Sequence, residues 1–196
     1  MHLGGAEPGQ TPVDPDEANQ LIPSWVSTRS DLDSAEQENI ATAVEWSSRA
    51  RWSPSNILDD RFLRRLHRRM FGEVWRWAGS YRTSARNIGV DAWRIPEEVA
   101  LLLDDARYWV EHETYPIDEI GIRFHHRLVT IHPFPNGNGR HARLAADVLL
   151  ESLGAPPFTW GIDRDEDSAQ LRNEYIAAIL AADDGDIEPL LAFARS

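Results

Sequence analysis

The sequence predicts one mainly α-helical domain that carries a single small β-hairpin. Apolar residues recur every three or four positions along several stretches, which is the period of a helix with one buried face. Helix-ending residues such as Gly72 and Gly154 follow these stretches. With 42% hydrophobic residues and eight Trp among 196 residues, the chain is long and apolar enough to enclose one core of ordinary size.

Helices are expected wherever this period meets a capping or breaking residue. The first covers 30–50, with Ser30 or Ser34 as its cap and Leu32, Ala35 and Ala43 among its buried positions. Further helices are predicted at 59–71, from Pro96 until the Tyr115-Pro116 break, at 117–132, 142–153, 167–182 and 187–194. Residues 1–20 are rich in Gly, Pro, Asp and Glu, so we expect an N-terminal arm at 1–29 ahead of a domain at 30–196.

The segment 80–95 differs in composition from the helices around it. From Tyr81 onward it reads Y-R-T-S-A-R-N-I-G-V-D, which mixes strand-forming residues with turn residues. We therefore predict the small β-hairpin here. From these residues alone, it is either an ordinary connection or a flap over a site.

The overall charge and composition exclude several classes of protein. A formal net charge of −12 repels a phosphate backbone on average, so direct nucleic-acid binding is not expected. The chain has no Cys and therefore neither disulfides nor thiolate chemistry. It has no run of 18 apolar residues and no basic-then-apolar leader, so we expect a cytoplasmic protein that does not contact a membrane.

The most informative stretch is 131–143, which reads I-H-P-F-P-N-G-N-G-R-H-A-R. Its prolines end one helix near His132, and another helix begins after the glycines. The N-terminus of that second helix favours an anion such as a phosphate, and Arg140 and Arg143 can reach the same anion because they are three positions apart. His132 can take up a proton at neutral pH. A structural turn beside a structural histidine remains the alternative at this point.

The run H-P-F-P-N-G-N-G-R-H-A-R resembles the signature of the Fic/Doc family, H-x-F-x-[DE]-G-N-G-R-x-x-R. It departs from that signature at one fixed position, where Asn136 replaces the acidic residue. Within the family, the chain looks most like the group called mobile mystery protein B. The resemblance implies a Fic fold, a helical bundle with one small β-hairpin flap at 80–95 and the Fic motif at 132–143.

The resemblance also implies an activity, namely the transfer of AMP from ATP to a Ser, Thr or Tyr hydroxyl of a target protein. In this scheme His132 is the general base and Arg140 stabilises charge on the α- and β-phosphates. Arg143 holds the γ-phosphate. The backbone N–H groups of Gly137, Asn138 and Gly139 hold the diphosphate. The side-chain amide of Asn138 assists them.

Three further expectations come from the same resemblance. Tyr175, on a late helix, is the candidate for a contact with adenine, and Asn87, Ile88 and Gly89 are assigned to the flap that binds the target. A Mg²⁺ ion that bridges the phosphates is expected at Asn136. The amide of Asn136 is a poorer ligand for this hard cation than a carboxylate.

An inhibitory motif is the last feature implied. The run S-A-E-Q-E-N from Ser34 to Asn39 resembles the family pattern [ST]-x-x-x-E-[GN]. By this resemblance Glu38 pairs with Arg143 in place of the γ-phosphate. The alternative is a solvated glutamate on an acidic helix.

Other chemistries fit less well. The histidines lack the spacing of a zinc site, and the chain has no Lys for a Walker-type loop. Gly139 stands where the Doc-like kinase branch of the family has Lys, which favours nucleotidyl transfer. The main alternative is a non-enzymatic nucleotide-binding or toxin-like interaction protein with an altered Mg²⁺ site. Resemblance to mobile mystery protein B also suggests mobile mystery protein A, a small DNA-binding protein, as a partner.

Overall fold

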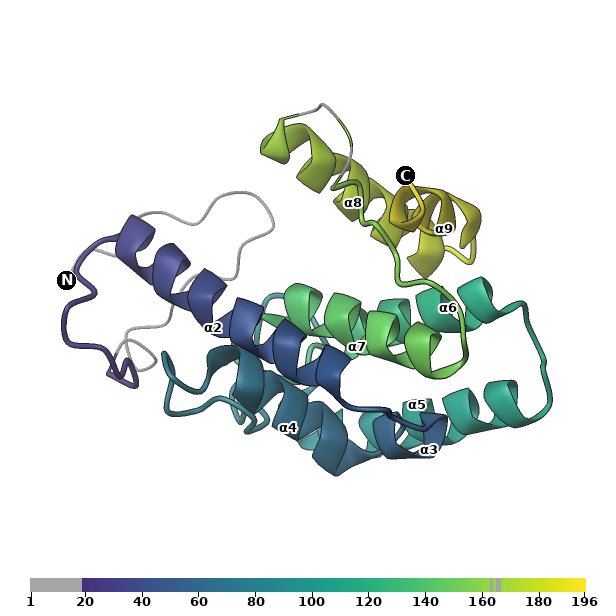
Figure 1. Ribbon diagram of the computed structural model, residues 1–196, viewed down its shortest axis with the longest axis horizontal. Coiled ribbons are helices and arrows are strands. Elements are labelled where there is room, and N and C mark those ends of the chain that lie inside the picture. The colour runs from purple at the N-terminus through teal and green to yellow at the C-terminus, as the bar shows by residue number, and fades with distance from the viewer. Residues whose placement is uncertain (1–18, 163, 165–166) are drawn as a thin grey trace.

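The computed structural model describes residues 19–162, 164 and 167–196, and most of them are helical (Figure 1). The order along the chain is α2 (Arg29–Arg49), α3 (Pro54–Ile57), α4 (Asp60–Phe71), the 3-10 turn η1 (Ala92–Arg94), α5 (Ile95–Glu111), α6 (Ile117–Ile131), α7 (Asn138–Ser152), α8 (Ser168–Asp183) and α9 (Glu188–Ala194). The mainly helical class is confirmed. The predicted helices are present, although α7 begins at Asn138, before the expected Ala142.

Helices α6 and α7 lie side by side at the centre of the bundle (Figure 1). Helices α2 and α4 pack on each other and on α7, while α5 lies along α6. The C-terminal pair α8 and α9 forms a separate layer that contacts the bundle mainly through α9 and α6. None of the helices in the described part of the chain is long and apolar enough to cross a membrane.

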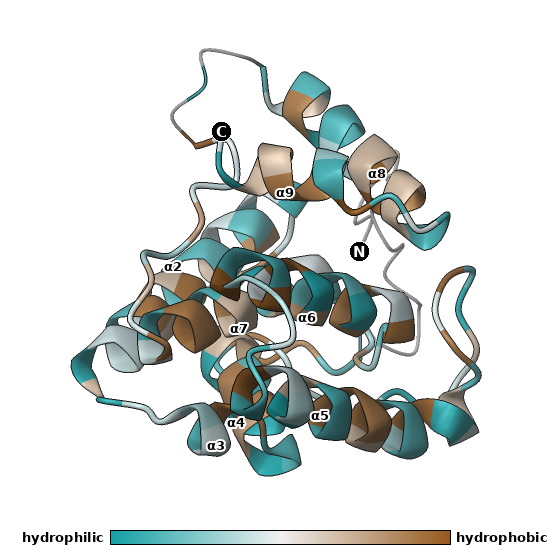
Figure 2. Cartoon of the chain, turned by 90° about the vertical axis from the view of Figure 1, so that its right-hand side faces the viewer, coloured by the Kyte–Doolittle hydropathy of each residue, from teal (hydrophilic) through white to brown (hydrophobic). Residues whose placement is uncertain are grey.

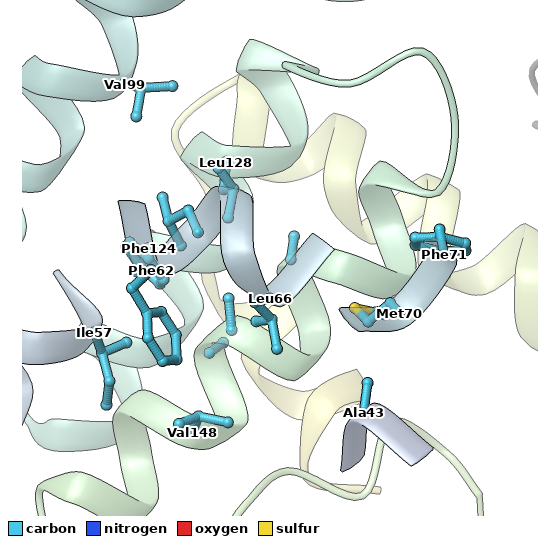
Figure 3. Packing of buried hydrophobic residues seen from close by; sticks show 14 of the residues in the cluster. Ala43, Ile57, Phe62, Leu66, Met70, Phe71, Val99, Phe124, Leu128 and Val148 are labelled. Atoms are coloured by element: carbon cyan, nitrogen blue, oxygen red, sulfur yellow. The ribbon is translucent and has the colours of Figure 1, made fainter. Parts of the chain in front are cut away.

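The main core is built from buried residues of all the helices from α2 to α7. In Figure 3, Ile57, Phe62, Leu66, Phe124 and Leu128 converge in one cluster, and all of them are nearly inaccessible to water. Polar and apolar bands alternate along the helices in Figure 2, as expected for helices that bury one face. A smaller core lies under the C-terminal pair and contains Ile122, Leu150, Phe158, Ala178, Ala182, Leu190 and Ala194.

Helix α2 begins with a cap that the sequence analysis assigned wrongly. Thr28 is the cap, in place of Ser30 or Ser34: its hydroxyl accepts a hydrogen bond from the Asp31 N–H (3.1 Å). The Asp31 carboxylate in turn accepts from the Thr28 N–H (2.8 Å), which completes a capping box. Backbone N–H groups of Ser27 and Thr28 hold the pKa of Asp31 at about 2.

The predicted β-hairpin is wrong, because the described residues contain no strand at 80–95. The backbone at the two ends of this segment pairs with the end of α6 instead of with itself. The N–H of Arg82 donates to the Pro133 carbonyl (2.9 Å), and the N–H of Val90 donates to the Ile131 carbonyl (3.3 Å). The segment is therefore a loop tied to the motif, and we call it the flap loop.

The predicted N-terminal arm falls partly outside the described residues, which begin at residue 19. The part that is described, 19–28, lies on the body of the domain. Leu21 forms an isolated antiparallel bridge with Trp75, and Val26 is only 1% exposed. The end of the predicted arm thus contributes to the core.

Three histidines, His67, His125 and His141, are completely buried in this fold. Burial disfavours the charged imidazolium, so the pKa of His67 is well below its usual range. The same cause lowers the pKa of His125 to about 3 and that of His141 to about 4. All three rings are neutral at neutral pH.

We expect the free energy of unfolding to decrease as the pH is lowered from 7 to 4. The unfolded chain takes up protons below the ordinary histidine pKa, while the folded protein does not, so stability is complete above that pKa and is lost below it. For His141, whose pKa falls from 6.5 to about 4, the loss at pH 4 is about 3 kcal/mol. Burial raises the pKa of Asp147 to about 6. This shift makes the free energy of unfolding increase as the pH is lowered, but it concerns one group, whereas three histidines act the other way.

Urea unfolding at a series of pH values measures this slope, and His141→Gln should make it shallower. A free energy of unfolding that stays level between pH 7 and 4.5 would contradict the prediction.

Candidate active site

His132 ends α6 in a left-handed conformation (φ 53°, ψ 59°), and Pro133 directly after it cannot continue the helix. Its side chain is 6% exposed, and neither ring nitrogen makes a hydrogen bond with a described residue. Burial lowers the pKa of His132 to about 4, and the charge of Arg82 adds to this effect. The nearby Val129 carbonyl raises the pKa by less. The ring is therefore neutral and can accept a proton.

The loop after His132 is tied to α7 by the side chain of Asn138. The Phe134 N–H donates to Oδ1 of Asn138 (2.9 Å), and Nδ2 of Asn138 donates to the Phe134 carbonyl (2.8 Å). Phe134 itself is fully buried. The expected role of the Asn138 side chain in holding a diphosphate is thus wrong, because both of its polar atoms are used by the loop.

His67 of α4 also contacts and supports this loop. The N–H of Gly79 donates to Nδ1 of His67 (3.0 Å), so the proton lies on Nε2, which donates to the Asn136 carbonyl (3.0 Å). The ring also stacks on Phe134, with 3.8 Å between centroids. Sequence reasoning missed His67. Its position directly after Leu66, on the buried face of α4, was the available signal.

The first turn of α7 keeps most of its backbone donors available. Gly137 donates its N–H to Oδ1 of the preceding Asn136 (2.6 Å), so this donor is occupied. The N–H groups of Asn138, Gly139 and Arg140 have no acceptor within the helix, because the first turn of a helix lacks a preceding turn. They and the helix dipole provide a site for an anion.

The two glycines of the motif are needed for different reasons. Gly137 has φ 78°, and a Cβ there would lie 2.5 Å from Cζ of Phe71, so a side chain does not fit. A Cβ on Gly139 would meet only the Tyr175 hydroxyl, at 3.8 Å. Gly139 therefore leaves open the space between α7 and Tyr175 of α8, and the contact of Tyr175 with adenine stays a prediction.

The two motif arginines lie in contrasting surroundings. Arg140 Nη2 lies 2.7 Å from Oε2 of Glu36, and its guanidinium lies over the Phe71 ring. Arg143 lies over the rings of Tyr175 (4.8 Å to the centroid) and Trp160 (5.9 Å), and its Nε makes no hydrogen bond with a described residue. Arg140 is thus paired with a carboxylate, whereas aromatic rings hold Arg143.

Both rings beside Arg143 are fixed by partners of their own. The Tyr175 hydroxyl lies 3.0 Å from Nε2 of His125. Nε1 of Trp160 donates to the carboxylate of Asp147 (3.0 Å). These contacts connect the C-terminal part of the chain to the motif. They also give Tyr175 a role that the sequence did not suggest, as a support for Arg143.

The residues expected to inhibit the site do not reach the arginines. Ser34 and Glu38 are exposed on α2. Asn39 is buried, but it joins α2 to the end of α4: its Nδ2 donates to the Arg69 carbonyl (2.9 Å) and its Oδ1 accepts from the Glu73 N–H (3.0 Å). The expected pair of Glu38 with Arg143 is therefore not formed.

Glu36, two residues earlier, is the carboxylate that lies at the motif. It is 2% exposed, and besides Arg140 it accepts a hydrogen bond from Nε1 of Trp75 (2.7 Å). Helix positions two apart point about 200° apart, so only one of the two glutamates can face the motif. The signal was present in the helix period, because Glu36 is four positions after the buried Leu32 and seven before the buried Ala43.

The assigned flap residues Asn87, Ile88 and Gly89 are exposed, and Ile88 is 49% exposed. They also lie close to the histidine. A Cβ on Gly89 would be 2.6 Å from Cβ of His132, so the flap loop passes directly against this residue. The flap loop is thus at the site although it is not a hairpin.

Comparison with known proteins agrees with this arrangement. Residues 57–150 match the model of the Fic/DOC family. The chain is 32% identical over 133 residues to a protein adenylyltransferase Fic from Drosophila grimshawi, a match that covers 65% of this chain and 26% of that protein. The chain thus spans about a quarter of the length of the curated relatives it matches.

Solved structures give the same fold. Residues 134–508 of Fic-1 from C. elegans superpose with a TM-score of 0.68 and 25% identity, covering 91% of this chain and 51% of that one. The N-terminal Fic domain of a VirB-translocated Bep effector from Bartonella quintana, solved with bound ADP, has a TM-score of 0.70 and 16% identity, covering 91% and 94%. The matched segment includes the whole motif, so residues 57–150 of this chain carry a Fic/DOC family domain.

Proposed function

We propose that this protein transfers AMP from ATP to a hydroxyl side chain of a target protein. The observation that carries the proposal is the position of His132, a neutral, buried imidazole whose nitrogens make no hydrogen bond with a described residue, beside a helix N-terminus that bears two arginines. The names of the related proteins, protein adenylyltransferases, support the same reaction. The ADP-bound relative from Bartonella quintana supports a nucleotide as the ligand.

In the proposed reaction His132 accepts the proton of the target hydroxyl while that oxygen attacks the α-phosphorus of ATP. A new phosphorus–oxygen bond forms to the target, the bond between the α-phosphorus and the bridging oxygen breaks, and pyrophosphate leaves. The N–H groups of Asn138 and Gly139 hold phosphate oxygens at the start of α7. Arg140 and Arg143 stabilise the charge on the departing pyrophosphate.

The residues at the motif fit a magnesium ion that is held mainly by phosphates and water. Asn136 offers one neutral oxygen, Oδ1, which already accepts the Gly137 N–H. No group of three or more His, Asp or Glu side chains gathers as a ligand set in the described part of the chain. Mg²⁺ favours few protein ligands together with substrate phosphates, so Asn136 would be the contribution of this chain. When bound, the ion neutralises phosphate charge.

Incubation with ATP labelled at the α-phosphate tests the reaction. We expect label to pass to protein, and His132→Ala to reduce the rate by at least about 100-fold, because the general base is lost. His112→Ala, which removes an exposed histidine, is the matched control and should leave the rate unchanged. No transfer by the wild-type chain to any protein in a host lysate would refute the enzyme.

A second candidate function is nucleotide binding without transfer, and the neutral Asn136 favours it. Isothermal titration with ATP and Mg²⁺ separates the two functions, because a sensor binds the nucleotide while the labelling assay stays negative.

We place the target protein of the proposed transfer at the flap loop. Mobile mystery protein A remains a proposed partner, by the resemblance of the sequence to mobile mystery protein B.

We further propose that Glu36 restrains the site, in the role first assigned to Glu38. The buried Glu36 carboxylate occupies one donor of Arg140 and cancels its charge, and that donor is then not available to a phosphate. A partly buried contact of this kind corresponds to about 1–3 kcal/mol of coupling between the carboxylate and the nucleotide.

We expect Glu36→Gln to raise the rate of AMP transfer or the affinity for ATP by about 5- to 100-fold. Glutamine keeps the acceptor for Trp75 and removes the charge. Glu38→Gln, a matched change at an exposed position of the same helix, should have no effect. If Glu36→Gln lowers activity, the carboxylate positions Arg140 for catalysis and does not restrain it.

Asn136→Asp tests the magnesium argument. A restored carboxylate should lower the Mg²⁺ concentration needed for half-maximal transfer by about tenfold, because an anionic oxygen binds this cation better than an amide. The measurement is a magnesium titration of the labelling rate at fixed ATP. An unchanged Mg²⁺ requirement would mean that the phosphates and water alone hold the ion.

A further inference from the structure

The flap loop is organised by one buried guanidinium, that of Arg82, which is 3% exposed. Its Nε donates to the His132 carbonyl (2.7 Å) and its Nη1 to the Ser84 carbonyl (3.0 Å). Its Nη2 donates to the Val90 carbonyl, at the other end of the loop. One side chain therefore joins both ends of the flap loop to the backbone of the proposed base.

The backbone of the same residues completes this arrangement. The N–H of Arg82 donates to the Pro133 carbonyl (2.9 Å), so Arg82 brackets the His132–Pro133 peptide with backbone and side chain. Gly89 passes next to both groups: a Cβ there would lie 2.6 Å from Cβ of His132 and 2.8 Å from Nη2 of Arg82. The flap loop, the guanidinium and the histidine are thus in mutual contact.

We propose that Arg82 is a positioning residue. It holds His132 and the flap loop in a fixed relative position, so that the hydroxyl of a target bound at the flap loop meets the imidazole. The inference rests on the proposed AMP transfer for its kinetic consequence, but the contacts themselves do not depend on it. Because Arg82 bonds only to carbonyl groups in these contacts, it acts on His132 through the backbone.

The chemistry of the position calls for arginine. A guanidinium carries five N–H donors in a fixed plane, which can serve three carbonyls in different directions, whereas a lysine ammonium sits on a flexible stem as a point donor. Burial lowers the pKa of Arg82, and the Asp91 carboxylate counteracts this. The left-handed His132 also gains from the bond, because its carbonyl cannot continue the α6 ladder.

The structure offers a control in Arg68, an exposed arginine. Its Nε donates to the Ala78 carbonyl (3.3 Å), in the connection that leads from α4 toward the flap loop. Arg68 thus makes the same kind of bond, from an arginine to a backbone carbonyl, without contact to His132 or Val90. A change that acts only by loosening this connection should appear in Arg68 variants as well.

Hydrogen–deuterium exchange of the full chain tests the positioning role without any assay of activity. In Arg82→Gln and Arg82→Lys we expect the two hydrogen-bonded amides of the flap loop, those of residues 82 and 90, to exchange at least about tenfold faster, with α4 and α7 unchanged, because local opening is released without global unfolding. Arg68→Gln should leave these two amides as in the wild type. Unchanged exchange at residues 82 and 90, or equal acceleration over the whole chain, would overturn the proposal.

Titration of His132 by NMR gives a second readout. Removing the positive charge in Arg82→Gln should raise the pKa of His132, while Arg82→Lys, which keeps the charge, should leave it nearly unchanged; Arg86, the other positive group near the ring, is present in both. In the transfer assay both variants should lower kcat by at least about tenfold, with the KM for ATP within about twofold, because positioning affects the base and not the nucleotide.

These readouts distinguish the two proposals. If the wild-type chain transfers no AMP, the proposed function fails, while exchange and titration still decide the role of Arg82. If transfer occurs and Arg82→Gln changes the KM for ATP as strongly as kcat, Arg82 is a general structural residue and the positioning role is refuted.

Discussion

The paired hydrogen bonds between the Asn138 amide and the Phe134 backbone are the constraint on which the site depends. Between α6 and α7 the chain must reverse direction within a few residues, and two prolines remove backbone donors from that stretch. Asn138 supplies both a donor and an acceptor from the first turn of α7 and so replaces the missing backbone pairing. With the loop held in this way, the N–H groups of the first turn of α7 are left without an acceptor inside the helix.

The surrounding helices then supply rigidity in layers. His67 bonds the loop carbonyl at Asn136 and stacks on Phe134, and its own tautomer is set by Gly79. Neutral imidazoles are well suited to this task, because each carries one donor and one acceptor in a flat, apolar ring. Burial keeps His132 neutral, and burial also keeps His67 neutral, so that His67 can link parts of the structure around His132.

Much of this arrangement could be predicted from the sequence. The helical period predicted the helices of the bundle, and the motif named His132, Gly137 and both arginines as candidate site residues. Tertiary contacts decided the rest. The hairpin failed because the ends of the flap loop pair with the end of α6 and with Arg82, which no local pattern reveals. Glu38 was chosen by motif spacing, whereas the buried stripe of α2 selects Glu36. The Asn138 side chain was expected to help hold the diphosphate. Its bond to the Phe134 backbone depends on the geometry of the turn, which the sequence pattern does not reveal.

The aromatic support of Arg143 has a consequence for how the site could lose its function. Tyr175 belongs to the C-terminal pair of helices, which packs largely on the smaller core and only partly on the bundle. The imidazole and the amide donors rest on the main core instead. Local unfolding of α8 and α9 alone would therefore remove one side of the surroundings of Arg143 and leave His132 in place, so that the proposed contact with the distal phosphate and the proposed proton transfer can be lost separately.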